Sequence, residues 1–375
     1  MSDIQKQVQR AIDRLVEAGT EQGLQVSVYH RGEPVVEAVA GVADQATGRA
    51  VTPGTVFYNY SVGKSATSAV VHVLAERGDL SYGTRVAEVW PEFAAHGKDK
   101  VTVRQVLDHS AGVPGIPLDT TVEDLCDWDR MTAAAAAAEP WWEPGAKTGY
   151  HAYTFGYILG EVVRRVTGRP ISQVLREDVA GPLGIADEIY FGMPESEHGR
   201  LATLVEPAVP EGEAAPDEWP EMPADLPMFR AGPIETFPNA AFGNRTDTLA
   251  ADIPAGGKTS ARAMARLYAA LLGEVDGVRL ISPERLREVT EVSISGTDEV
   301  FGNPAKWGLG YALGFSLDEE LDVPTAFGMG GVGGAYAFGD TASGVAFAVT
   351  KNTVSPDFTT STELARLITR ALSTS

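Results

Sequence analysis

The chain is poor in the residues from which disulfides, metal sites and nucleic-acid surfaces are built. Its 375 residues include one cysteine, Cys126, so no intrachain disulfide can form. The six histidines show no metal-ligand spacing, and nothing indicates a structural zinc site. Only 30 basic residues stand against 51 acidic ones, a formal charge of −21. This charge argues against nucleic-acid binding and against docking on an anionic membrane, and it suits a small-molecule partner.

Long apolar segments are also missing. No window approaches about 18 uninterrupted apolar residues, so we expect no membrane span. The first 19 residues have no apolar signal core, and Ile4, Val8, Ile12 and Leu15 instead recur at helical spacing among charges. We therefore predict an amphipathic first helix and a cytoplasmic location.

Strand-like patterns gather at the two ends of the chain. Residues 24–30 and 35–40 flank a turn at 31–34 and predict a β-hairpin. Further strands are predicted at 307–315, 325–331, 335–338 and 345–350, followed by a closing helix at 362–372. Strands at both ends with helices between them indicate one sheet built from both termini around a helical insertion.

The middle of the chain is helical in character. Helices are predicted at 103–109, 133–138 and 155–166, and others begin after Ser260 and Ser282. Residues 195–257 are instead rich in proline and acidic residues and show little periodicity. Long irregular stretches in compact domains are often binding loops or lids, so we expect this stretch to help select the substrate.

The most informative motif is Ser61-Val62-Gly63-Lys64, which places a hydroxyl and an amine three residues apart. A serine hydroxyl becomes a good nucleophile when an adjacent base takes its proton, and a lysine at i+3 is within reach if the serine opens a helix. With 19 serines and eight lysines, this spacing arises by chance about 0.4 times. The motif alone is therefore weak evidence.

The residues around Ser61 favour a helix start. An aromatic run, Phe57-Tyr58-Asn59-Tyr60, leads into it, and apolar residues then recur at helical spacing until Gly78. At a helix N-terminus, free backbone N–H groups favour developing negative charge. The same local pattern is also compatible with a capping serine and a solvated surface lysine.

A second motif occupies residues 144–152, Pro-Gly-Ala-Lys-Thr-Gly-Tyr-His-Ala. Together with the segments 101–112 and 156–168, it resembles the serine β-lactamase and penicillin-binding-protein superfamily, in its class C and family VIII carboxylesterase branch. The resemblance implies that Tyr150 is the general acid/base that works with Lys64. A tyrosine with a pKa of about 10 in water needs a nearby cation to stabilise its phenolate, and Lys64 would supply one. The alternative is an ordinary aromatic residue at a helix start.

The family's third motif, Lys-Thr-Gly or a related tripeptide, lies on a strand beside the site. Lys147-Thr148-Gly149 has the letters but no strand pattern, and Lys258-Thr259-Ser260 precedes a helix. Met329-Gly330-Gly331-Val332 fits by order and context, since its glycines would let substrate approach the backbone. The resemblance then implies an oxyanion hole made of the Ser61 and Val332 amides. The alternative is a glycine-rich turn between core strands.

Two positions depart from the family pattern. Ala152 stands where β-lactamases usually carry an asparagine that holds the substrate amide, and Met329 stands where a basic or aromatic residue is usual. Both departures favour a neutral acyl substrate over a penicillin. The candidate substrate-binding residues are therefore His151, Met329, Gly330 and Gly331, although His151 could equally point away from Tyr150.

The resemblance implies an α+β, β-lactamase/transpeptidase-like fold, with an antiparallel sheet flanked by helices and a mainly helical middle region. We expect one catalytic domain over residues 1–375, with the sheet in 1–80 and 280–375 and the helices and substrate loops in 81–279. The implied activity is a serine esterase that acts on a small-molecule ester or acyl substrate, with little or no β-lactamase activity. No cofactor, metal, nucleic acid or membrane partner is expected.

Two alternatives to the esterase stay open. An acyltransferase, including an amide-forming or peptide-cyclising enzyme, would use the same acyl-enzyme and pass the acyl group to another nucleophile. A non-catalytic ligand-binding protein would keep the fold without the reaction.

Overall fold

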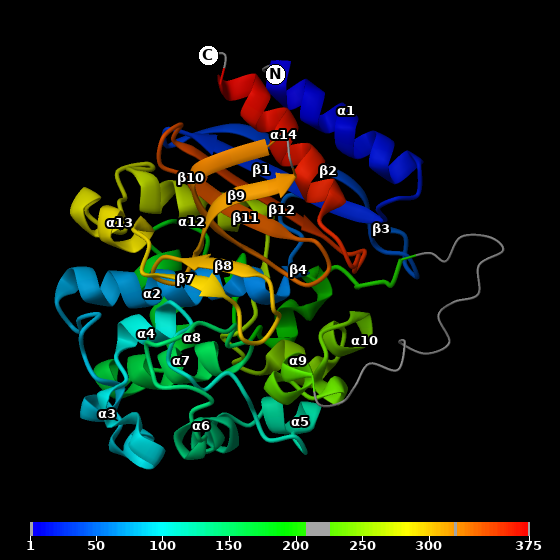
Figure 1. Cartoon of the computed structure of the whole chain (residues 1–375). Coiled ribbons are helices and arrows are strands. Elements are labelled where there is room, and N and C mark those ends of the chain that lie inside the picture. The colour runs from blue at the N-terminus through cyan, green and yellow to red at the C-terminus, as the bar shows by residue number, and fades with distance from the viewer. Residues whose placement is uncertain (1–2, 208–225, 319–320, 374–375) are drawn as a thin grey trace.

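The computed structural model describes residues 3–207, 226–318 and 321–373, and a single large sheet joins the two ends of the chain (Figure 1). Its nine strands lie in the order β3-β2-β1-β12-β11-β10-β9-β8-β7, and neighbouring strands are antiparallel. The bounds are β1 Gly23–His30, β2 Glu33–Asp44, β3 Arg49–Ala50, β7 Ile294–Thr297, β8 Pro304–Trp307, β9 Ala312–Asp318, β10 Leu321–Gly330, β11 Tyr336–Asp340 and β12 Val345–Lys351. The predicted α+β fold is confirmed.

The first and last strands of the chain are neighbours inside this sheet. Strand β1 pairs with β12 from Leu24 opposite Lys351 to His30 opposite Val345. The β1–β2 hairpin turns at Arg31 and Gly32, whose φ angles are 53° and 87°. Two positive φ values in a two-residue loop match the twist of the flanking strands, which accounts for the predicted hairpin.

The terminal helices α1 (Asp3–Glu17) and α14 (Thr359–Ser373) lie side by side over one face of the sheet, at the top of Figure 1. Val8 and Ile12 of α1 pack with Leu364 and Ile368 of α14 in one apolar cluster with strand residues. The predicted amphipathic first helix is therefore confirmed. The closing helix begins at Thr359, three residues before its predicted start.

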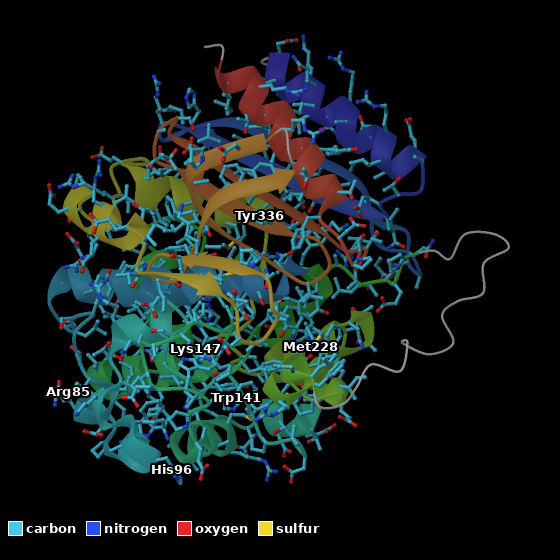
Figure 2. The ribbon with its side chains drawn as sticks, viewed as in Figure 1. Arg85, His96, Trp141, Lys147, Met228 and Tyr336 are labelled. Atoms are coloured by element: carbon cyan, nitrogen blue, oxygen red, sulfur yellow. The ribbon has the colours of Figure 1, made fainter. Side chains whose placement is uncertain are left out.

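On the opposite face, α2 (Lys64–Arg77) and α12 (Ala261–Leu272) separate the sheet from the helical part. Helix α2 is buried from Lys64 to Ala75 and ends at Gly78 in the left-handed conformation. The other helices are α3 Val86–Val89, α4 Val103–Leu107, α5 Val122–Leu125, α6 Trp128–Ala137, α7 Thr154–Thr167, α8 Ile171–Val174, α13 Pro283–Thr290, the 3₁₀ helix η2 Pro91–Lys100 and the π-helix η3 Leu175–Ala180. In Figure 2, Tyr336 lies in the sheet layer, whereas Trp141 and Lys147 lie in the helical part.

Two strand predictions differ from the structure. The strand predicted at 307–315 is broken between β8 and β9, because Gly310 takes a φ of 85° and a Cβ there would lie 2.1 Å from the Ser68 Oγ. Lys258–Thr259, which the sequence placed only before a helix, forms the two-residue strand β6. It pairs with β4 (Phe57–Tyr58) and β5 (Ile189–Tyr190) in a second, three-stranded sheet.

The stretch predicted to be irregular, 195–257, contains five short helices separated by irregular segments in its described part. These are η4 Glu195–Arg200, α9 Pro227–Ala231, η5 Ile234–Thr236, α10 Ala240–Gly243 and α11 Thr246–Ala250. Residues 208–225 lie outside the described part of the chain. Across the described residues, no helix combines the length and the apolar character needed to cross a bilayer.

Candidate active site

Ser61 lies in a short 3₁₀ turn, η1 (Tyr60–Gly63), that runs directly into α2. The turn is held from both sides by Gly257, which donates a hydrogen bond to the Tyr60 carbonyl (3.0 Å) and accepts one from the Asn59 amide (2.8 Å). A Cβ on Gly63 would lie 2.2 Å from the Gly257 nitrogen, so the two backbones meet where no side chain fits. Ser61 is therefore fixed by backbone contacts and does not act as the cap of α2, whose N-cap is Gly63.

The residue before Ser61 has an unusual backbone conformation. Tyr60 has a φ of 47°, in the left-handed region that residues other than glycine rarely adopt. Its ring stacks on Tyr58 at a centroid separation of 4.7 Å, and its hydroxyl donates to the Asn239 carbonyl at 2.6 Å. Surrounding packing thus holds a strained residue next to Ser61, and such strain is common at reactive sites.

Lys64 is buried beneath Ser61. Its Nζ lies 3.1 Å from the Ser61 Oγ and 2.8 Å from the Ala255 carbonyl, and the residue is 1% exposed. Burial lowers the Lys64 pKa to about 7, because an ammonium loses its hydration in the interior. The structure therefore places this lysine in the interior, where it can accept a proton near neutral pH, and not on the surface.

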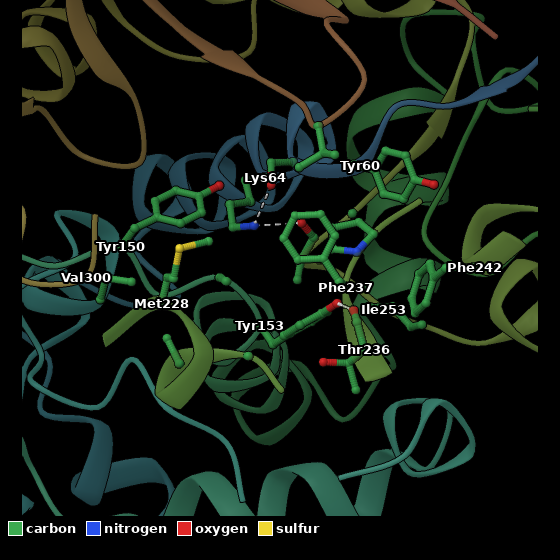
Figure 3. Close-up of a pocket in the computed structure, with 18 of the residues that line it drawn as sticks. Tyr60, Lys64, Tyr150, Tyr153, Met228, Thr236, Phe237, Phe242, Ile253 and Val300 are labelled. Atoms are coloured by element: carbon green, nitrogen blue, oxygen red, sulfur yellow. Dashed lines mark hydrogen bonds between the residues drawn. The ribbon is translucent and has the colours of Figure 1, made fainter. Parts of the chain in front are cut away.

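Tyr150 lies close to Lys64, the residue that contacts Ser61. The Lys64 Nζ lies 5.0 Å from the centre of its ring, and Figure 3 shows Lys64 with Tyr150 on one side and Tyr60 on the other. Burial raises the Tyr150 pKa, and hydrogen bonding with the Ser61 side chain partly opposes that rise. A raised pKa keeps the phenol protonated at rest, which suits a proton donor.

The segment after β10 approaches Ser61 through its backbone. A Cβ on Gly331 would lie 2.1 Å from the Asn59 carbonyl oxygen, so this position accepts no side chain. The next residue, Val332, lines the pocket, and its amide donates to no other residue in the described part of the chain. The Ser61 amide lies at the start of η1, where helix N–H groups have no intrahelical acceptor. Two residues that line the same pocket, Ser61 and Val332, thus have backbone amides with no acceptor in the described part of the chain.

None of the four candidate substrate-binding residues is among those that line the pocket. His151 is fully buried, with its Nδ1 donating to the Gly149 carbonyl (2.7 Å) and its Nε2 accepting from the Val113 amide (3.1 Å). Met329 is 3% exposed within β10, and Gly330 packs against Phe358. Gly331 packs its backbone against the Asn59 carbonyl, two residues before Ser61 in the sequence.

The two Lys-Thr tripeptides that the sequence set aside as the third motif lie outside the pocket lining. Lys147 is half exposed and forms an ion pair of 3.2 Å with Glu299 in the helical part (Figure 2). Lys258 is fully buried, donates to the Phe191 carbonyl and lies 4.7 Å from the centre of the Tyr58 ring. Burial lowers its pKa to about 7. It packs behind the aromatic run that leads to Ser61 and does not line the pocket.

The pocket above Ser61 is lined mainly by apolar and aromatic side chains (Figure 3). Aromatic residues from separate segments form its walls, namely Tyr58, Tyr60, Tyr153, Phe229, Phe237 and Phe242. Among the described lining residues, Lys64 is the only Lys, Arg, His, Asp or Glu. The departure noted in the sequence, Ala152, is also part of the lining.

Sequence reasoning missed most of this lining. The aperiodic stretch 195–257 supplies Phe229, Phe237 and Phe242, but its sequence pointed to none of these residues individually. No group of three or more His, Cys, Asp or Glu within the described ranges could hold a metal ion.

Comparison with known proteins matches this arrangement to one family. A model of the family described as Beta-lactamase matches residues 8–370. The chain is 35% identical over 335 residues to the esterase/beta-lactamase LipL of Mycobacterium tuberculosis, covering 87% of this chain and 76% of that protein. A family VIII carboxylesterase structure superposes with a TM-score of 0.87 at 33% identity, covering 98% of each chain. A penicillin-binding-protein homologue from Caulobacter crescentus gives a TM-score of 0.84 at 33% identity, covering 100% of this chain and 98% of that one.

Proposed function

The chain belongs to the beta-lactamase family, and we propose that it is the esterase-type member that its site suggests, a serine hydrolase acting on small-molecule esters through an acyl-enzyme at Ser61. The observation that carries the proposal is the 3.1 Å contact between the Lys64 Nζ and the Ser61 Oγ at the base of an apolar pocket. Residues 1–375 would form a single catalytic domain.

In this proposal, acylation begins when Lys64 accepts the Ser61 proton as the Oγ bonds to the ester carbonyl carbon. A Lys64 pKa of about 7 leaves much of the amine free to accept that proton at neutral pH. The carbonyl oxygen becomes an oxyanion held by the Ser61 and Val332 amides. Tyr150 then gives its proton to the leaving alkoxide as the ester C–O bond breaks.

Deacylation reverses these proton transfers. The Tyr150 phenolate now lies beside the Lys64 ammonium, which stabilises it. The phenolate takes a proton from water, the resulting hydroxide attacks the acyl carbon, and the Ser61 Oγ leaves and recovers its proton from Lys64. Tyr150 ends protonated and Lys64 ends neutral, as at the start.

The lining of the pocket supports a neutral, apolar acyl group. Aromatic walls bind apolar groups by burial and stacking. A substrate carboxylate would lose its hydration, and the only cation in the described lining is Lys64. Because Lys64 must be neutral to act as the base, it cannot also serve as the partner of that carboxylate. We therefore propose that uncharged acyl chains or rings are preferred over acids such as penicillins.

The same apolar lining supports a second candidate, an acyltransferase that passes the acyl group to an amine or alcohol. Which nucleophile releases the acyl-enzyme depends on how well the pocket excludes water. A non-catalytic binding protein is the third possibility, and it predicts no covalent intermediate.

One experiment separates these functions. The protein and a Ser61→Ala variant are incubated with p-nitrophenyl acetate and butyrate, and the acyl adduct is followed by intact mass alongside p-nitrophenol release. The esterase predicts an adduct and turnover that both require Ser61. An adduct that water releases slowly, and that added amines or alcohols release quickly, would favour the acyltransferase.

Two controls complete the test. Nitrocefin in the same assay should be hydrolysed weakly or not at all. The absence of both adduct and Ser61-dependent turnover would exclude both enzyme functions.

A further inference from the structure

His109 contacts the chain on both sides of Tyr150. Its carbonyl accepts a hydrogen bond from the Gly149 amide at 3.1 Å, and its Nδ1 accepts one from the His151 amide, also at 3.1 Å. Its ring lies against the Tyr150 ring at a centroid separation of 4.8 Å. One residue therefore holds both neighbours of Tyr150 and packs on Tyr150 itself.

The backbone of His109 makes this double contact possible. Its φ is 61°, in the left-handed region that residues other than glycine seldom adopt. The side chain is fully buried and also packs against Trp307 and Phe155, at centroid separations of 4.4 and 5.0 Å. An uncommon backbone conformation held by the surrounding structure is typical of a residue with a specific role.

The hydrogen bonds define the tautomer of the imidazole. Because Nδ1 accepts from the His151 amide, the proton of the neutral ring must be on Nε2. That Nε2 has no hydrogen-bond partner among the described residues. Protonating Nδ1 would set two donors against each other and break the contact with His151.

The surroundings of His109 disfavour its charged form. Burial, with Lys64 and His151 nearby, holds the His109 pKa well below its usual range. The neighbouring carboxylate of Asp108 is already engaged by Ser110 and Ser293. The ring therefore stays neutral, and its Nδ1 remains an acceptor.

We infer that His109 is the positioning residue for Tyr150, holding residues 149 and 151 so that the phenol stays beside Lys64 and Ser61. This inference rests on the proposed function, in which Tyr150 transfers a proton. Catalytic groups must be held closely, since a displacement of about 1 Å can lower the rate by about 10²-fold. His109 itself is not among the residues that line the pocket, so we assign it no direct part in the reaction.

Three substitutions test the role of the Nδ1 acceptor. Asparagine places its Oδ1 at the same branch of the side chain and tolerates positive φ, so His109→Asn keeps both features. Glycine in H109G tolerates the conformation but has no acceptor. Leucine in H109L fills space but has no acceptor. His72→Leu is the matched control, because His72 is another buried histidine, whose ring contacts Tyr82 and Leu309 away from Tyr150.

The first readout is steady-state hydrolysis of p-nitrophenyl butyrate. Rates are normalised to the fraction of Ser61 that an alkyl phosphonate labels to completion, measured by intact mass. We expect H109L and H109G to lose about 10²-fold in kcat with KM changed less than about threefold. The kcat of H109N should stay within about tenfold of the wild-type value. H72L should lower the melting temperature without changing the normalised kcat.

The second readout does not depend on activity. Hydrogen–deuterium exchange of peptides covering residues 144–153 should speed up in H109L and H109G, and much less in H109N. Unchanged exchange, an unchanged kcat in H109L, or an H109N protein as slow as H109G would each overturn the inference. If the unchanged protein shows no Ser61-dependent turnover, the proposed function fails, and the exchange data still decide whether His109 holds this segment.

Discussion

The Nζ of Lys64 lies 3.1 Å from the Oγ of Ser61, although the lysine is only 1% exposed. The two properties have one origin, because the helix that buries the lysine also carries it beneath the turn that holds the serine. Burial lowers the Lys64 pKa to about 7, which makes the amine a usable base. The same burial should weaken the fold, and both consequences can be measured.

The first prediction concerns the pH dependence of acylation. Lys64 must be neutral to accept the Ser61 proton, so the acylation rate should rise with pH and level off above an inflection near pH 7. Below that inflection, the rate should fall about tenfold per pH unit. Since burial raises the Tyr150 pKa, its ionisation should add no second inflection below about pH 10. Stopped-flow release of p-nitrophenol between pH 5 and 9, corrected with Ser61→Ala, measures this profile, and a rate that still rises tenfold per pH unit at pH 9 would contradict it.

The second prediction concerns stability. The folded-state pKa of Lys64, about 7, lies below its ordinary value of 10.5, so between these pH values the unfolded chain binds a proton that the folded chain does not. The contribution of Lys64 to the free energy of unfolding therefore rises with pH between about 7 and 10.5. Below about pH 7, the full cost of burying the ammonium is present. Lys64→Met should abolish turnover and raise the free energy of unfolding at pH 7 by about 1–3 kcal/mol. Urea unfolding at pH 7 and pH 9 tests both the gain and its decline at higher pH.

Lys351 provides the matched control for that substitution. It is also a buried lysine, but its Nζ lies 2.5 Å from the Glu21 carboxylate, and both side chains are at most 2% exposed. Removing it leaves a buried carboxylate without its cation, so Lys351→Met should destabilise the fold by about 3 kcal/mol or more. If both lysine variants shifted stability in the same direction, the burial argument for Lys64 would be wrong.

The third prediction concerns Tyr150. Tyr150→Phe removes the hydroxyl and keeps the ring that packs against His109 and Trp307. Turnover of p-nitrophenyl butyrate should fall by about 10²- to 10⁴-fold, with little change in melting temperature. Esters with poorer leaving groups, such as ethyl butyrate, should lose more, because their alkoxides need the donated proton. Equal losses for both classes of ester would argue that Tyr150 does not protonate the leaving group.

Periodicity predicted the parts of the fold that depend on local pattern. The amphipathic first helix, the hairpin at Arg31 and Gly32 and the capped start of α12 each follow from short-range physical chemistry. The small sheet β4-β6-β5 did not, because its strands have two residues each and exist only through pairing with distant partners. The break at Gly310 depends on its contact with Ser68, more than 200 residues away in the sequence, and no local pattern reports that contact.

The candidate site divides in the same way. Ser61, Lys64 and Tyr150 were found from motif spacing and resemblance, and the structure brings them together. His151 and Met329 do not line the pocket, because neighbours in sequence point to different sides of the chain. Half of the aromatic wall, Phe229, Phe237 and Phe242, comes from the stretch 195–257, whose sequence has no periodicity, so only the folded chain reveals it.

The fourth prediction tests the proposed oxyanion hole through the backbone beside Val332. A Cβ on Gly331 would lie 2.1 Å from the Asn59 carbonyl oxygen, so Gly331→Ala must shift the backbone at 331 and with it the amide of the next residue, Val332. Loss of one oxyanion donor typically lowers kcat by about 10²- to 10³-fold, and KM should change little because the donor acts mainly in the transition state. Gly199→Ala is the control, since Gly199 is exposed and a Cβ there meets nothing within 4 Å.

Kinetics with p-nitrophenyl butyrate and circular dichroism melts on both variants decide between a local and a global effect. A folded G331A protein with reduced kcat places the Val332 amide in the reaction. A folded G331A protein with unchanged kcat would mean that the oxyanion is stabilised elsewhere, because the backbone at 331 cannot keep its position once it carries a methyl group.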